Sequence, residues 1–99
     1  MNEKKSDLLS NEFKVACEIF LFNDEGKKVW FTNLVESLKD EMGQTTVMNS
    51  LRTLFDWGIV QAEFGETGKG RAGRLLYISG ESKDTIRQVC EAYWKPRRR

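Results

Sequence analysis

The chain has 99 residues, of which 39% are hydrophobic and 31% charged, and it contains no His. This length fits a single domain with a modest core, and no apolar run approaches the ~20 residues that a membrane-spanning helix needs. Without His, the commonest acid–base catalyst is missing, and no zinc-ligand spacing or nucleophile beside a recognisable base is present. We therefore predict a protein that is not an enzyme and that holds no metal or cofactor.

Charge is distributed unevenly along the chain. Residues 1–58 contain seven Lys and Arg against ten Asp and Glu, a net charge of −3, whereas residues 59–99 contain nine against five, a net charge of +4. The second segment is therefore the candidate contact surface for a polyanion. No apolar signal-peptide core precedes residue 10, so the expected location is the cytoplasm.

Residues 1–9 are polar and lack periodicity, which predicts a flexible N-terminal arm or a weak first turn. Ser10 is a suitable N-cap for a helix over residues 11–22, where apolar side chains cover more than a narrow stripe. Such a helix should be buried on a broad face. Turn residues follow at 23–26, and Gly26 can take a positive φ and end this helix.

Residues 28–31 are too few and too β-prone for a helix, so they predict a short strand or an extended bridge. Thr32 is a suitable N-cap for a second helix that continues to Met42, and Gly43 ends it. Only residues 43–45 separate this helix from the next one. A short connection that contains glycine is typical of a helix-turn-helix.

Thr45 is the expected N-cap of a third, amphipathic helix that ends at Trp57 and Gly58. One side of this helix carries Val47, Leu51, Leu54 and Phe55, at positions i, i+4, i+7 and i+8. The opposite side carries Thr46, Asn49, Ser50, Arg52, Thr53 and Asp56. Asn can pair with adenine, Arg with guanine and Thr methyl groups with thymine, so this polar side suits base edges.

Two strands are predicted next, over residues 59–64 and 74–79. The segment between them, residues 65–73, contains four glycines and predicts a hairpin tip. Three cations lie in or beside this tip, with no acid between the first and the last, which favours contact with phosphates. They are Lys69, Arg71 and Arg74.

The final predicted helix begins after Ser82, and its apolar positions are Ile86, Val89, Cys90 and Tyr93, at i, i+3, i+4 and i+7. This stripe needs a packing partner, for which a second copy of the chain is one answer. Pro96 ends the helix within a basic tail. Cys17 and Cys90 are expected to be buried, reduced thiols, and Trp30, Trp57 and Trp94 to be core or interface residues.

This order of elements resembles the winged helix-turn-helix proteins, in particular the small MarR-like and PadR-like transcriptional regulators of bacteria and archaea. The segment SLRTLFDWGIV (50–60) is similar to the end of their recognition helix, and GKGRAGRLLYIS (68–79) to their arginine-rich wing and following strand. The resemblance implies an α+β, mainly α fold, with a three-helix core, a short sheet bearing a wing hairpin and a C-terminal helix. The expected organisation is an arm (1–9), a winged-helix domain (10–94) and a basic tail (95–99).

The resemblance further implies sequence-specific binding of double-stranded DNA by a homodimeric, nucleoid-associated regulator of transcription. The recognition helix, about 45–57, would lie in the major groove, and the wing, 65–74, on the backbone or in the minor groove. The N- and C-terminal helices would form the dimer. The implied DNA-binding residues are Thr45, Thr46, Asn49, Ser50, Arg52 and Thr53 on the helix, and Lys69, Arg71 and Arg74 on the wing.

Two alternatives remain open from the sequence. The same fold can serve as a protein–protein interaction adaptor, and the net charge of +1 favours this reading, whereas the basic wing counts against it. The other alternative is an architectural protein that coats DNA without sequence preference.

Overall fold

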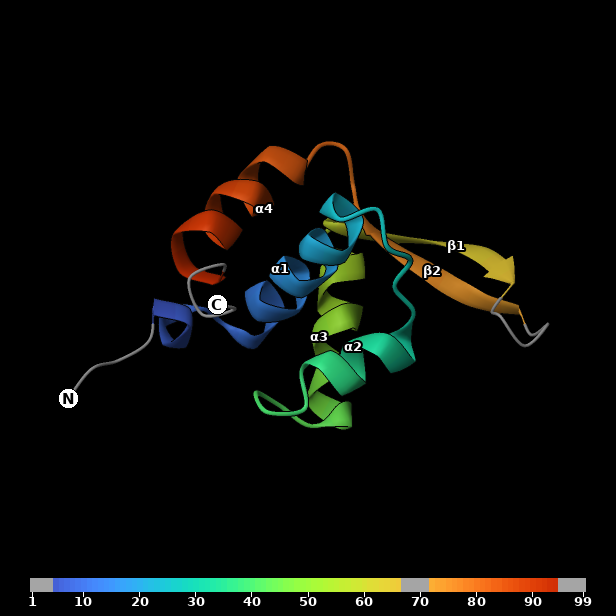
Figure 1. Cartoon of the computed structure of the whole chain (residues 1–99), viewed down its shortest axis with the longest axis horizontal. Coiled ribbons are helices and arrows are strands. Elements are labelled where there is room, and N and C mark those ends of the chain that lie inside the picture. Colours follow the sequence, from blue (N-terminus) through green and yellow to red (C-terminus); the bar gives the residue numbers. More distant parts are fainter. Residues whose placement is uncertain (1–4, 67–71, 95–99) are drawn as a thin grey trace.

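The computed structural model describes residues 5–66 and 72–94, and in these ranges four α-helices pack together while one antiparallel hairpin projects from them (Figure 1). In chain order the elements are a 3-10 turn, η1 (Lys5–Leu8), then α1 (Asn11–Asp24), α2 (Phe31–Ser37), α3 (Gln44–Asp56), β1 (Val60–Glu66), β2 (Ala72–Ile78), α4 (Lys83–Val89) and a π-helical turn, η2 (Cys90–Trp94). The predicted fold class is confirmed. Among the described residues, none of the helices combines the length and the apolarity needed to span a bilayer.

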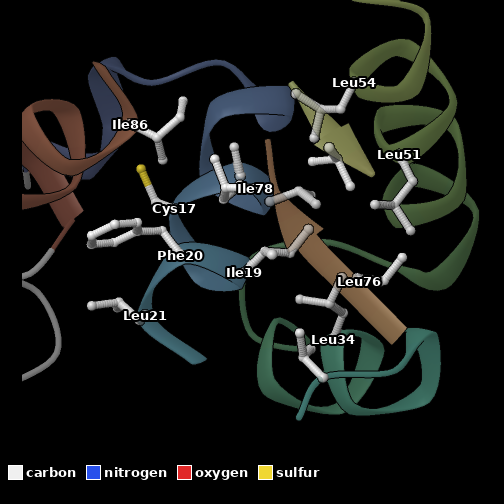
Figure 2. Packing of buried hydrophobic residues seen from close by; sticks show 14 of the residues in the cluster. Cys17, Ile19, Phe20, Leu21, Leu34, Leu51, Leu54, Leu76, Ile78 and Ile86 are labelled. Atoms are coloured by element: carbon white, nitrogen blue, oxygen red, sulfur yellow. The ribbon is translucent and has the colours of Figure 1, made fainter. Parts of the chain in front are cut away.

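Helix α1 forms the centre of the domain. Ser10 caps it by accepting a hydrogen bond from the backbone N–H of Phe13 at 3.3 Å, and Gly26, with φ of 72°, follows its last turn. Every residue from 15 to 21 is buried, because α3, α4 and β2 pack around the helix. In Figure 2, α1 side chains extend both toward Ile86 of α4 and toward Ile78 of β2. The middle of α1 is therefore enclosed within a single chain.

The segment before α2 is an extended bridge, one of the two predicted alternatives. The Leu76 N–H of the sheet donates a hydrogen bond to the Val29 carbonyl of this segment at 2.9 Å. Helix α2 starts at Phe31, before the predicted cap Thr32, because the Asn33 side chain accepts from the Trp30 N–H at 2.9 Å and fixes the first turn there. It ends at Ser37 rather than Met42, since the chain tightens into a turn after Leu38.

A buried acid joins the C-terminal turn to α1. Glu18 is only 1% exposed, and the indole N–H of Trp94 donates to its Oε1 at 2.8 Å. The prediction that Tyr93 completes the apolar stripe of the last helix is wrong, because Trp94 is buried and Tyr93 is 37% exposed. A π-helical turn holds more residues than an α-helical turn, which rotates Trp94 rather than Tyr93 toward the core.

Cys17 and Cys90 are both buried and form no disulfide, as predicted. A hydrogen bond with Cys90, followed by burial, raises the pKa of the Cys17 thiol far above its ordinary value. Because the thiolate is the reactive form of cysteine, Cys17 is an unreactive packing residue at neutral pH. Of the three tryptophans, Trp94 is in the core, Trp30 is half-buried and Trp57 is 55% exposed.

Replacing Trp94 with Phe should lower the free energy of unfolding by about 1–3 kcal/mol, because a buried carboxylate loses an indole donor. Chemical denaturation of the variant measures the change. Tyr93→Phe is the matched control, since it alters an exposed neighbour, and it should leave the unfolding midpoint almost unchanged. Equal destabilisation by the two variants would contradict the proposed role of the Glu18–Trp94 hydrogen bond.

Candidate nucleic-acid interface

The polar side of α3 lies on the outside of the domain. Its buried residues are Val47, Ser50, Leu51 and Leu54, which face the core. Of the predicted contact residues on this helix, Thr45, Asn49 and Arg52 are exposed, and Thr46 and Thr53 are half-buried. The Thr53 hydroxyl donates to the Asn49 carbonyl at 3.2 Å, so its hydrogen is already engaged by the backbone.

Two expectations about α3 are wrong. Ser50 is only 2% exposed and cannot contact a ligand, because with Val47, Leu51 and Leu54 it occupies positions i, i+3, i+4 and i+7, the face that packs inward. Thr45 is not the N-cap. That position belongs to Gly43, whose extended backbone precedes the first turn, so Thr45 lies inside the helix with its side chain exposed.

On the wing, Arg74 is exposed and lies directly opposite Phe64 in the antiparallel register. Its guanidinium carbon is 6.0 Å from the centre of the Phe64 ring, within cation–π range. Lys69 and Arg71, the other two predicted wing contacts, lie outside the described residues. The hairpin extends away from the helices, as Figure 1 shows.

A groove of about 460 Å³ separates α3 from β2. Its lining residues are Trp30, Phe31, Thr32, Met48, Leu51, Arg52, Phe55, Gly73, Arg74 and Leu76. Arg52 lines it from the helix and Arg74 from the wing, and none of the described residues that line it is acidic. Within the described part of the chain neither guanidinium forms an ion pair. Both charges are therefore available to an anion that lies along the groove.

The position of β2 beside α3 depends on Asn23, in the last turn of α1. Its amide nitrogen donates to the Leu76 carbonyl at 3.3 Å, and its amide oxygen accepts from the Ile78 N–H at 3.0 Å. Together with the bond to Val29, these contacts occupy the edge of β2 that β1 leaves free. The base of the wing is thus attached to the central helix by backbone-directed hydrogen bonds.

The roles of Phe64 and Asn23 could not be predicted from the sequence. Phe64 was assigned only to a strand, although the alternation of Val60, Ala62 and Phe64 places all three on one face of it. Asn23 was assigned only to a turn, and no local pattern distinguishes an Asn that pairs with a distant strand from an Asn that ends a helix.

Replacing Asn23 with Ala should loosen the base of the wing. The Ile78 amide, which loses its acceptor, should exchange with solvent at least about tenfold faster, measured by hydrogen exchange with NMR detection. Asn23→Asp is the matched control, because a carboxylate oxygen can still accept from Ile78. If both variants protect this amide as well as the wild-type chain does, Asn23 does not hold the wing.

No family model matches the chain, and no curated protein matches it. Among solved structures, it is similar to the circadian clock associated protein Pex from Anabaena, with a TM-score of 0.70 and 17% identity over 90% of this chain and 80% of Pex. PadR of Bacillus subtilis, solved in complex with operator DNA, gives 0.60 and 10% over 79% of this chain and 45% of PadR. A MarR family regulator from Neisseria meningitidis gives 0.60 and 21% over 87% and 55%, respectively. At these identities the similarity concerns the fold: the chain has the winged helix-turn-helix fold of these proteins.

Proposed function

We propose that this chain is a small transcriptional regulator that binds double-stranded DNA in a sequence-specific manner. The observation that carries the proposal is the groove that Arg52 of α3 and Arg74 of β2 line together. DNA presents base edges inside its grooves and phosphates beside them, which suits one cation that contacts a base and another that contacts the backbone. The fold shared with PadR, which was solved with operator DNA, supports the same role.

In this proposal α3 enters the major groove. Asn49 and Arg52 are exposed one turn apart on its outward side, where Asn can pair with adenine and Arg with guanine, and the Thr46 methyl can contact thymine. Thr45, Thr46 and Thr53 have short side chains, which allow close approach of the helix to the base edges. Arg74 contacts the backbone, and we assign Lys69 and Arg71 to the same role.

We propose that the regulator is a homodimer. Burial within one chain limits which surfaces can form the dimer interface. Because the middle of α1 is buried within one chain, this helix can contribute only its ends. The outer side of α4 and the adjoining turns remain, where Leu8 of η1 and Tyr93 of η2 are exposed and the two turns pack together. Helix α4 lies on another side of α1 from α3 (Figure 1), so pairing through α4 leaves both grooves open. Sedimentation at twice the chain mass is the expected result.

An adaptor that binds protein is the competing proposal. The groove favours it to some degree, because Met48, Leu51, Phe55 and other apolar side chains form much of the lining. A mobility shift with random duplex DNA separates the two proposals: an adaptor would leave the duplex unretarded even at low salt.

Arg52→Ala should relax base preference at one position of the site by about 1–3 kcal/mol. Arg74→Gln should instead weaken binding to all sequences alike and reduce the log–log salt slope by about 0.9, because one phosphate contact is lost. Binding titrations at several salt concentrations, on duplexes selected from a random pool, measure both effects.

Arg87→Gln is the matched control for these two variants. Arg87 is a cation of α4 that pairs with Asp84 at 3.0 Å, away from the groove, and its replacement should change neither quantity. A change in base preference caused by Arg74→Gln, with the salt slope intact, would contradict its assignment to a phosphate.

A further inference from the structure

Phe64 is 78% exposed, more than any other large apolar side chain of the described residues. Isolated exposed apolar residues are common on protein surfaces and need no function. Phe64 differs because it lies in a strand rather than in a loop, and because its ring has a specific neighbour, the guanidinium of Arg74.

The pairing register places Phe64 on the side of the wing that faces α3. Side chains alternate along a strand, so Phe64 shares a face with Val60 and Ala62, which pack toward the core. On β2 the same face carries Ile78, Leu76 and Arg74, and the last two line the groove beside α3. Phe64 therefore extends the side of the groove that Leu76 and Arg74 form, beyond the core residues Val60 and Ala62.

The strands that carry Phe64 and Arg74 are held in place in the free protein. Backbone pairing fixes the strand that carries Phe64, and the bonds of Asn23 and Val29 hold the partner strand against α1. The cation–π contact restrains the ring and the guanidinium relative to each other. Because the strand backbones are fixed before binding, little backbone order remains to be gained when the ring contacts a ligand.

We infer that Phe64 is a wedge residue, which packs its ring against a base step in the minor groove while Arg74 contacts the neighbouring phosphate. The inference rests on the proposed DNA-binding function. Apolar side chains presented to the minor groove unstack base steps partly and kink the duplex. Because pyrimidine–purine steps kink most readily, the wing would favour such a step without hydrogen-bonding to its bases.

The test uses the whole chain and short duplexes selected by the wild-type protein from a random pool. Phe64→Ala should bind the selected duplex roughly tenfold more weakly, with an unchanged salt slope, and should lose the bend that energy transfer between dyes at the two duplex ends reports. Phe64→Leu keeps an apolar wedge without a ring and should retain the bend. Circular dichroism checks that each variant remains folded, as expected for an exposed position.

Trp57→Ala is the matched control, because Trp57 is an exposed aromatic residue at the far end of α3 and does not line the groove. It should leave affinity and bend unchanged. If Phe64→Ala binds and bends DNA as the control does, the wedge is excluded while DNA binding stands. If Phe64→Ala and Phe64→Leu both lower the salt slope as Arg74→Gln does, Phe64 only positions Arg74, and the inference is overturned.

A wild-type chain that retards no duplex at low salt gives a different pattern of failure. That result rejects the proposed function and the wedge together. DNA binding by the wild-type chain therefore distinguishes failure of the wedge from failure of the proposed function.

Discussion

The domain is organised around the buried middle of α1. Seven consecutive residues, from 15 to 21, are buried, so apolar cover is needed all around the helix rather than along one stripe. Helices α3 and α4 and strand β2 supply it. Glu18 adds a polar requirement inside this enclosure, and the indole of Trp94 meets it from the last turn of the chain. Burying a carboxylate is costly unless it is hydrogen-bonded, so closure of the C-terminal turn is coupled to the core.

The candidate interface follows from the same packing. Helix α3 gives its apolar face, Ser50 included, to the core, and its polar side is left facing outward. Strand β2 is fixed to the end of α1 by Asn23, which sets the wing beside α3. Arg52 and Arg74, 22 positions apart in the sequence, then line one groove. Packing of the core brings these two cations to the same groove, although like charges repel each other.

Most of the fold could be predicted because the elements carry local signals. Apolar periodicity indicated the helices, and glycines and the alternation of strand residues indicated the hairpin. The errors arose where a side chain's direction depends on its surroundings. Ser50 looked like a surface residue by type, yet helical spacing places it in the buried stripe. An α-helical repeat places Tyr93 on the apolar stripe of the last helix, whereas the π-helical turn that the chain forms leaves it 37% exposed.

The candidate site was less predictable than the fold. Its helix residues could be predicted from one face of α3. The groove, however, forms only where β2, which is distant in the sequence, meets α2 and α3. Phe64 is an example of a site residue that could not be predicted from the sequence. An apolar strand residue is buried only where helices cover the sheet. The sequence around Phe64 does not indicate where this cover ends, and Phe64 is exposed.

The most direct measurement is an NMR titration of the labelled chain with duplex DNA at low salt, following backbone amide shifts residue by residue. The predicted result is a continuous set of perturbed amides on the outward side of α3, around Thr45, Asn49 and Arg52, and on β2 around Arg74. Amides of α4 should move little. Perturbations confined to α4, or none at any DNA concentration, would contradict a DNA-binding surface formed by α3 and the wing.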